Sequence, residues 1–318
     1  MRKALIFAVV FVFVGAILFT VALAAGGWDI RNLGSPKYET NEYEIVENVE
    51  NISVKSDTTD VRFLPSVDEK IRVVCYENTK IKNVISVVDG ILKIEPQDTR
   101  KWYDHISFFD FSSPDITVYL PEREYGALSV KISTGDVKIK SGSSFESIDL
   151  SGSTSDVECG DCVKGLLDIK VSTGDVDLCA LDAGEIKVKT STGDIDFENV
   201  SCASSIYVES DTGEAEFSSV RCNDFTRKAD TGDTELEDVI AKGKFTFNQD
   251  TGDVKFDRCD ASEIYVKTST GDVKGSFLTD KVVYADTSTG KKDVPKSTSG
   301  GMCEIKTSTG NIIIKIVK

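Results

Sequence analysis

One short motif recurs at intervals of 19 or 20 residues through residues 126–318. It reads Ser-Thr-Gly or Asp-Thr-Gly and is followed in most copies by an acidic residue. The glycines are Gly135, Gly174, Gly193, Gly213, Gly232, Gly252, Gly271, Gly290 and Gly310, and Ser155 occupies the one remaining slot. A period this regular indicates a repeat architecture, in which each unit contacts only its neighbours.

Apolar and polar residues alternate on both sides of each glycine, as in Ile186/Val188 before Gly193 and Ile195/Phe197 after it. This alternation predicts two short strands per repeat, each with one buried face, and the intervening Thr-Gly-Asp predicts a bend. One such unit cannot bury its own apolar face. We therefore expect an all-β fold, a parallel β-solenoid (β-helix) of 19–20-residue coils about 4.8 Å apart. A β-propeller, whose blades need about 40 residues, is the alternative.

The N-terminus begins with Met1-Arg2-Lys3 and continues with residues 4–25, none of which is charged. At a rise of about 1.5 Å per residue, this segment can cross a hydrocarbon core about 30 Å thick. The basic residues before it predict a cytoplasmic tip at residues 1–3. We expect residues 4–25 to be a transmembrane anchor or uncleaved signal. The chain would then cross the plasma membrane once, with its C-terminal bulk extracytoplasmic. Cleavage near Ala24 is the alternative.

The remaining chain divides into three parts. Residues 26–37 are expected to be a linker, residues 38–125 irregular solenoid coils with insertions, and residues 126–318 the regular solenoid. The segment from Ser56 to Val61 is similar to a degenerate copy of the motif. Its Thr59 precedes Gly135 by 76 residues, the length of four 19-residue repeats.

The net charge of -16 argues against nucleic-acid binding, because such a surface repels phosphates. The single histidine, His105, excludes zinc sites that need two histidines. Asp-Thr-Gly is also the aspartic-protease signature, but copies on successive coils do not form two facing lobes. Catalysis needs a convergent, asymmetric site, and uniform repeats supply none. We expect no enzymatic activity. A polysaccharide-active β-helix enzyme, a lyase or glycosidase, is the alternative.

Two groups of residues are candidate binding sites. In three successive coils a second acid joins the acidic column, and hard cations such as calcium bind carboxylate oxygens. The candidate calcium ligands are Asp211, Glu214, Asp230, Asp233, Asp250 and Asp253. A solvated edge neutralised by nearby lysines is the alternative. The candidate ligand-binding aromatics, in a predicted loop, are Trp102, Tyr103, Phe108 and Phe109. An insertion that folds back and caps the first coils is the alternative. We expect no other cofactor.

Three further features depart from the pattern. Arg227 occupies a slot that is apolar in neighbouring coils, and we expect a bulge that turns it outward, with a paired internal arginine as the alternative. Cys202 and Cys222 occupy equivalent slots and should stack, as free buried thiols or as a disulfide. The last strand, residues 311–318, is expected at the uncovered end of the solenoid. A monomer guarded by Lys315 and Lys318 is favoured over a tail-to-tail dimer.

The order of segments resembles the bacterial putative-adhesin family, a β-strand-repeat domain of unknown function, over residues 40–318. The motifs that carry the resemblance are Ser56-Asp57-Thr58-Thr59-Asp60-Val61-Arg62-Phe63-Leu64-Pro65, Asp89-Gly90-Ile91-Leu92-Lys93-Ile94, Ile116-Thr117-Val118-Tyr119-Leu120-Pro121 and the serial Ser-Thr-Gly-Asp-Val. The resemblance implies a surface-exposed, membrane-tethered protein, in some members linked to envelope stress. It supplies no catalytic residues.

These features together predict a cell-surface, membrane-anchored and non-catalytic module for adhesion, binding or structure. Its expected partners are the membrane, through the N-terminal helix, and a cell-wall polymer or surface protein.

Overall fold

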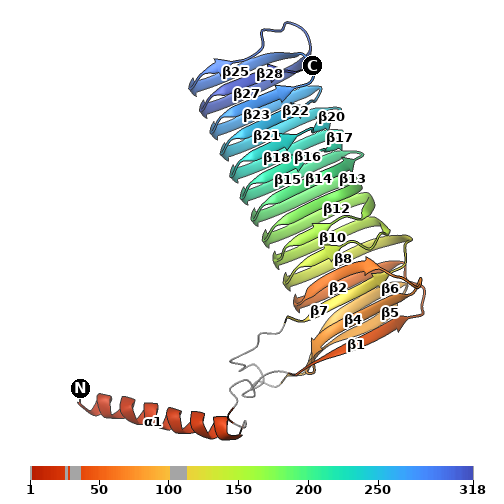
Figure 1. Ribbon diagram of the computed structural model, residues 1–318, viewed down its shortest axis with the longest axis vertical. Helices are drawn as coiled ribbons and strands as arrows, with labels where there is room; N and C mark the ends of the chain where they lie inside the picture. The colour runs from red at the N-terminus through yellow and green to blue at the C-terminus, as the bar shows by residue number, and fades with distance from the viewer. Residues whose placement is uncertain (1, 26–27, 29–36, 101–112, 318) are drawn as a thin grey trace.

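The computed structural model describes residues 2–25, 28, 37–100 and 113–317. Its first element is α1 (Arg2–Ala25), whose side chains are described at residues 10–21 and 24. Within the described residues, no helical stretch is both long enough and apolar enough to cross a membrane. Every other element in the part of the chain that the structure describes is a strand, and these strands belong to one hydrogen-bonded sheet that winds into coils (Figure 1).

Each regular coil contains two strands that pair in parallel with the equivalent strands of the neighbouring coils. The first strands are β8 (Glu124–Thr134), β10 (Ser144–Thr154), β12 (Cys162–Thr173), the second half of β13 (Val176–Thr192), β15 (Ser205–Thr212), β18 (Asp224–Thr231), β21 (Lys244–Thr251), β23 (Glu263–Thr270), β25 (Lys281–Thr289) and β27 (Gly301–Thr309). The second strands are β9 (Val137–Ile139), β11 (Val157–Cys159), the first half of β13, β14 (Ile195–Cys202), β16 (Ala215–Ser218), β19 (Thr234–Glu237), β22 (Val254–Cys259), β24 (Val273–Phe277), β26 (Lys292–Asp293) and β28 (Ile312–Ile316). Two coils add short corner strands, β17 (Arg221–Cys222) and β20 (Ile240–Ala241). The predicted parallel β-solenoid is confirmed, and the propeller alternative is wrong.

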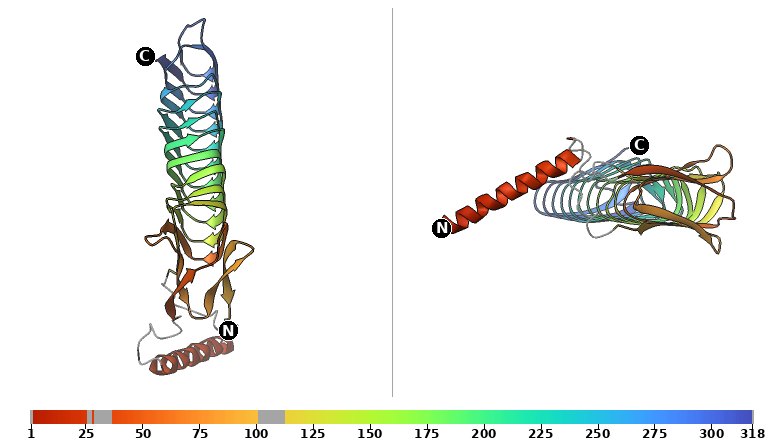
Figure 2. Two further views of the ribbon diagram at one scale, coloured as in Figure 1. Left: turned by 90° about the vertical axis from the view of Figure 1, so that its right-hand side faces the viewer. Right: turned by 90° about the horizontal axis from the view of Figure 1, so that it is seen from below.

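Alternate side chains of both strands fill a narrow interior, which gives the coils the flattened cross-section seen in Figure 2. A run of phenylalanines stacks through the C-terminal half of this core, with ring centroids 4.8 Å apart for Phe217–Phe225 and 5.4 Å apart for Phe247–Phe256. Each such pair adds about 0.5–1.5 kcal/mol to the hydrophobic burial. The core is therefore a continuous column shared by all coils.

The bend between the two strands requires glycine. Gly193 has a φ of 140°, and an added Cβ would lie 2.0 Å from the carbonyl oxygen of Gly174 in the coil before it. A side chain at Gly193 would therefore collide with the neighbouring coil. Ser155, in the equivalent slot of another coil, does not adopt a positive φ.

The sequence did not predict a second bend, which lies near the end of five successive second strands. Here a residue other than glycine adopts a left-handed conformation, with φ between 50° and 56°. The residues are Ala180, Asn199, Ser219, Asp238 and Arg258. Only Asn199 and Asp238 are types that favour this region, so residue identity gives no consistent signal for it.

At the N-terminal end, the order of coils in space differs from their order in sequence. The coil of β2 (Asn51–Thr58) and β3 (Asp60–Pro65) stacks directly on β8 and β9. Its other side pairs with β6 (Ile91–Asp98) and β7 (Asp115–Leu120), which come later in the chain. Thr59 therefore lies one coil from Gly135 and not four, although 76 residues separate them.

Antiparallel strands cap this end. Strand β5 (Ile81–Val88) pairs with β6, while β4 (Ile71–Asn78) pairs with β7 and with β1 (Tyr38–Ile45). The two groups lie on opposite sides of the solenoid (Figure 2). The expected irregular coils with insertions are thus one displaced coil, one closing coil and an antiparallel cap.

The C-terminal end shows the same exchange, and the expectation that residues 311–318 form the outer edge is wrong. Strand β28 lies between β24 and β26, and β27 lies between β23 and β25. The reason is polarity: Ile312 and Ile314 are buried, whereas Lys292 and Asp293 in the second strand of the other coil are exposed. The coil that can bury both faces takes the inner place, although β26 pairs with only Ile312 and Ile313 of β28. A monomer, favoured over a tail-to-tail dimer, stays a prediction.

Arg227 is fully buried, and the outward bulge predicted for it is wrong. Strand pairing continues without interruption from Val208 through Arg227 to Phe247. Its guanidinium donates to the Ser210 hydroxyl over 2.8 Å and to the Lys228 carbonyl over 2.5 Å, while Nε has no partner among the described residues. Burial lowers the pKa of Arg227 to about 10. The alternative, an internal arginine with hydrogen-bond partners, is confirmed, but the partners of Arg227 are neutral groups.

We predict that Arg227→Met stabilises the protein, because it removes a buried charge that no carboxylate compensates. The free energy of unfolding in urea should rise by about 1–3 kcal/mol. Arg227→Ala, which also leaves a cavity, is the control and should gain less or lose stability. A large loss in the methionine variant would contradict the assigned environment.

Candidate functional site

The outward side chains of five second strands line a groove of about 580 Å³, called here the charged groove. The strands are β16, β19, β22, β24 and β28. The groove lies where Gly275 stands at a position that carries phenylalanine, leucine or isoleucine in adjacent coils. An added Cβ at Gly275 would lie 2.1 Å from the Phe256 carbonyl oxygen, and the pairing of β22 with β24 shifts register at this point. Such an irregularity redirects nearby side chains.

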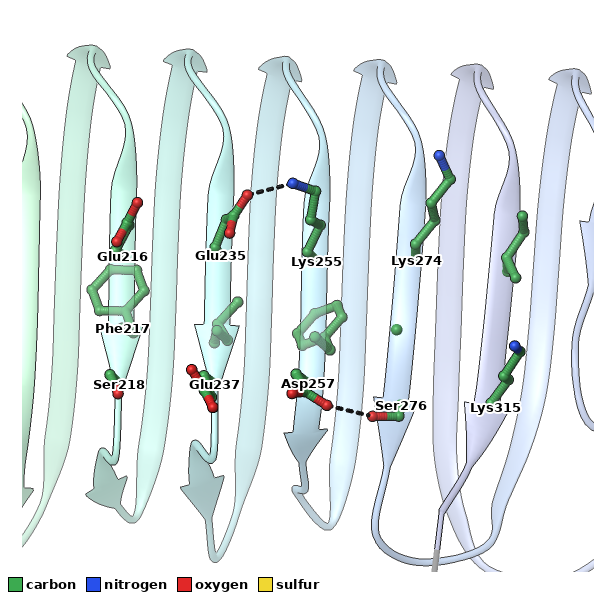
Figure 3. Close-up of a pocket in the computed structure, with 14 residues that line it drawn as sticks. Glu216, Phe217, Ser218, Glu235, Glu237, Lys255, Asp257, Lys274, Ser276 and Lys315 are labelled. Carbon is green, nitrogen blue, oxygen red and sulfur yellow. Dashed lines mark hydrogen bonds and ion pairs between the residues drawn. The ribbon is translucent and has the colours of Figure 1, made fainter.

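Two rows of side chains run along the groove, because equivalent outward positions repeat in every coil (Figure 3). One row contains Glu216, Glu235, Lys255 and Lys274, and the other contains Ser218, Glu237, Asp257, Ser276 and Lys315. Acidic residues therefore gather over β16 and β19, and lysines over β24 and β28.

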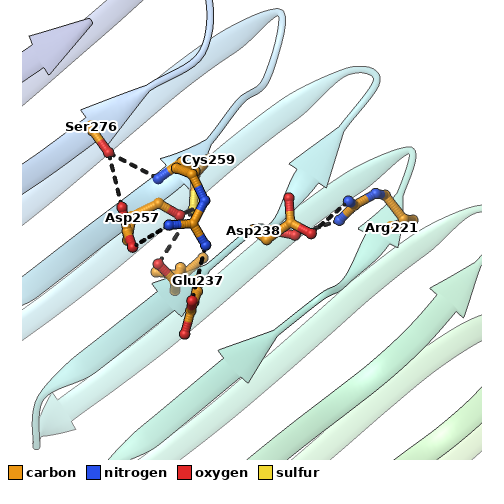
Figure 4. Close-up of polar contacts among 8 residues, drawn as sticks. Arg221, Glu237, Asp238, Asp257, Cys259 and Ser276 are labelled. Carbon is orange, nitrogen blue, oxygen red and sulfur yellow. Dashed lines mark hydrogen bonds and ion pairs between the residues drawn. The ribbon is translucent and has the colours of Figure 1, made fainter. Parts of the chain in front are cut away.

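In the middle of the groove, ion pairs link side chains of neighbouring coils within each row. Lys255 bonds to Glu235, which raises the pKa of the lysine. Arg258 donates to Glu237 over 2.9 Å and to Asp257 over 3.0 Å (Figure 4), and the bond to Glu237 raises the pKa of Arg258. The central charges are thus fixed by internal partners. At the two ends, Glu216 and Lys315 have no ion-pair partner among the described residues.

The second-strand face continues from the charged groove toward the N-terminal end as an acidic surface. Its members include Asp175, Asp177, Asp194, Asp196, Glu198 and Glu216. Partial burial raises the pKa of Asp196 to about 6, and the neighbouring carboxylates Asp177 and Glu216 add to the shift. Burial also raises the pKa of Asp177. Repulsion between equivalent positions of successive coils is therefore present in the folded state.

The acidic residue after each glycine has a structural role. One carboxylate oxygen accepts a hydrogen bond from the backbone amide of the equivalent residue in the next coil, as from Asp194 to Asp175 over 2.8 Å. The same bond recurs from Asp60 to Asn311, with a gap after Glu214, whose longer side chain receives no such bond. This ladder caps backbone amides that the strand pairing leaves free at the bend.

The six candidate calcium ligands are spread over two rows on successive coils. Among the described residues, no group of three or more aspartate, glutamate, histidine or cysteine side chains is placed to hold a metal ion. One oxygen each of Asp233 and Asp253 accepts an amide of the ladder, while Asp211, Asp230 and Asp250 are exposed. Calcium binding by these residues stays a prediction.

The other candidates fall into two groups. Trp102, Tyr103, Phe108 and Phe109 lie outside the described residues, as does His105. All eight cysteines are free, and Cys202 and Cys222 occupy equivalent buried places in adjacent coils, as expected. Burial raises the pKa of Cys222 to about 12, so its thiol is not reactive at neutral pH.

The family profile of Toastrack DUF4097 matches residues 49–210 and 203–318. A protein from Bacteroides fragilis NCTC 9343 described as a "putative adhesin" is 16% identical, with 88% of this chain and 99% of that chain covered and a TM-score of 0.44. A second such protein, from Parabacteroides distasonis ATCC 8503, is 14% identical over 87% of this chain and 97% of its own, with a TM-score of 0.47. A "putative lipid binding protein" from the same organism is 15% identical over 89% and 99%, with a TM-score of 0.43. No curated protein matches the sequence.

We predict that Asp196→Asn stabilises the protein at pH 7 more than at pH 5. Because the folded-state pKa of Asp196 lies above its ordinary value, proton binding favours folding. This contribution is present below about pH 4 and is lost as the pH rises through about 6. The melting temperatures of variant and parent, measured across this range, should diverge with rising pH. Glu198→Gln, on the same strand, is the control, and a difference independent of pH would refute the assignment.

We predict that Asp175→Ala destabilises the solenoid by about 1–2 kcal/mol, because the Asp194 amide loses its acceptor. Asp175→Asn should retain stability, since Asn311 accepts the same bond in the native chain, from Lys291 over 3.0 Å. Urea unfolding of both variants tests this. Equal losses in the two would show that charge, and not amide capping, is what the aspartate contributes.

Proposed function

Since the chain belongs to the Toastrack DUF4097 family, a domain family of unknown function, we propose that it is a non-catalytic binding module of the cell surface. Its charged groove would bind an extended cell-wall polymer, and α1 would hold it at the membrane. The observation that carries this proposal is the arrangement of the groove. Its side chains stand at equal heights on successive coils, so an extended ligand can contact one side chain of each row in every coil it crosses.

Membrane attachment is supported by the residues of α1 whose side chains are described. Phe11, Val12, Phe13 and Phe19 are each more than half exposed, and residues 4–25 carry no charge. An apolar surface of this kind is stable when lipid covers it. Arg2 and Lys3 on one side of the segment favour an extracytoplasmic solenoid.

A binding role fits the charges of the groove better than a catalytic one. Glycoside hydrolysis needs two carboxyl groups, one of them free to donate a proton. Glu235, Glu237 and Asp257 are instead held by Lys255 or Arg258. The charges left for a ligand are Glu216 at one end and Lys315 at the other. They suit a polymer that carries both amino and carboxyl groups, such as peptidoglycan.

Cosedimentation with purified peptidoglycan sacculi tests this proposal. Full-length protein in detergent micelles should pellet with the sacculi. Lys274→Glu with Lys315→Glu reverses the basic end of the groove and should weaken binding about tenfold, the effect of roughly 1.4 kcal/mol. Lys267→Glu with Lys306→Glu makes the same charge change on first strands and should bind as the parent does. Equal binding by the groove variant and the parent would refute the proposal.

A further inference from the structure

A second hollow lies on the outer side of the first strands, near the N-terminal end of the solenoid. It consists of two adjoining parts of about 500 and 400 Å³ that share Ser151 and Gly152. We call it the serine trough. It crosses β2, β8, β10, β12 and the second half of β13, so it lies on different strands from those of the charged groove.

The trough exists because the coil of β10 departs from the repeat at three positions. Ser151 stands in register between Lys131 and Lys170, and Gly152 stands between Ile132 and Val171. Ser155 occupies the slot of the bend glycine. The changes at Ser151 and Gly152 reduce side-chain volume on the outer surface and beneath it, so this coil forms a low floor between higher neighbours. Ser155 instead adds a hydroxyl where the other coils have none.

A buried hydroxyl lies directly under this floor. Ser155 is 2% exposed, and its Oγ has no hydrogen-bond partner among the described residues. Oγ lies 2.8 Å from the place that a Cβ on Gly152 would occupy. An unsatisfied buried hydroxyl costs about 1–3 kcal/mol, and its hydrogen-bonding capacity is left unused beside the floor of the trough.

Lysines flank the floor on both sides: Lys55 and Lys131 on one, Lys170 and Lys189 on the other. The ion pairs of the outer two involve carboxylates at the ends of the trough, Lys55 with Glu95 over 2.6 Å and Lys189 with Glu209 over 2.7 Å. Asp57 and Asp211 also line these ends, so the basic part of the trough is its centre. Lys131 has no ion-pair partner among the described residues, and Lys170 shares only Asp168 of its own strand. The pair nearest the floor is therefore the most available to a ligand.

The spacing of this inner pair suits a single oxyanion. Lys131 and Lys170 are two coils apart, roughly 10 Å at about 4.8 Å per coil. Two ammonium groups that each contact one sulfate or carboxylate group at about 2.8 Å lie about 8 Å or less apart. The roughly 10 Å is the separation of the backbones, and the flexible lysine side chains can incline toward each other over Ser151 to meet this limit. Four serines in the outward row beside the lysines, Ser133, Ser153, Ser172 and Ser191, offer hydroxyls along the same direction.

We propose that the serine trough binds an acidic polysaccharide. One oxyanion of the ligand lies between Lys131 and Lys170 over Ser151, and its sugar hydroxyls meet the serine row. The net charge of -16 opposes this binding only weakly, because charges beyond about 8 Å are screened at physiological ionic strength. The site uses a different face from the charged groove, so it stands or falls separately from the proposed function.

Calorimetric titration of the full-length protein in detergent micelles with a dextran sulfate oligosaccharide tests the proposal, with unsulfated dextran as the neutral probe. Lys131→Gln with Lys170→Gln should weaken binding at least tenfold. Lys267→Gln with Lys306→Gln removes the same charge from the same row of distant coils and should have little effect.

A second variant separates the trough from its charge. Gly152→Val with Ser155→Gly restores the repeat pattern at both positions, fills the floor and leaves every lysine in place. It should also lose binding about tenfold, while thermal melting verifies that it folds and sacculus binding verifies that the charged groove is intact. Equal losses in the distant-lysine control, full binding by the filled variant or equal affinity for unsulfated dextran would each overturn the proposal.

Discussion

Hydrogen bonds between equivalent backbone groups of successive coils are the constraint on which this structure depends. They place each side chain directly above its counterpart one repeat earlier, as with Val188, Val208 and Arg227. Residues at equivalent positions therefore align in rows along the solenoid. Rows of apolar residues form a continuous core, and the row of aspartates after the bend forms a ladder of amide caps. Rows of exposed charge arise in the same way. A chemical feature on this surface is made by changing a row over a few coils, which is how both the charged groove and the serine trough arise.

The regular solenoid was predictable because local pattern and global fold agree in every repeat. The spacing of the glycines, the alternation around them and the need of each unit for neighbours all pointed to one architecture. The ends were not predictable from the period, because stacking order depends on which coil can bury both of its faces. The polarity of the two strands decides this order: Ile312 and Ile314 can be buried, and Lys292 and Asp293 cannot. This difference is informative only when the two coils are compared as candidates for the inner place.

The candidate sites were predicted less well. Attention to acidic residues found the column after the glycines and considered a solvated edge or, on three coils, a calcium site. It did not predict that the oxygens of this column accept backbone amides, as Asp175 does. Arg227 was expected outside because a buried charge is costly, yet the strand register keeps it inside. The serine trough left a sequence signal at Ser155, the one slot of the regular repeat without glycine. Its importance became visible only when register placed Gly152 and Ser151 in the same hollow.

The exchanged coils at the C-terminal end also set an order of events for folding. Strands β25 and β26 emerge from the ribosome before β27 and β28, when the edges of β23 and β24 are still unpaired. Those edges can accept β25 and β26 at once, because the motif at Gly290 has the spacing of any other repeat. If β25 and β26 pair there first, the native arrangement requires the later strands to displace them. The final placement follows burial and not the order of synthesis.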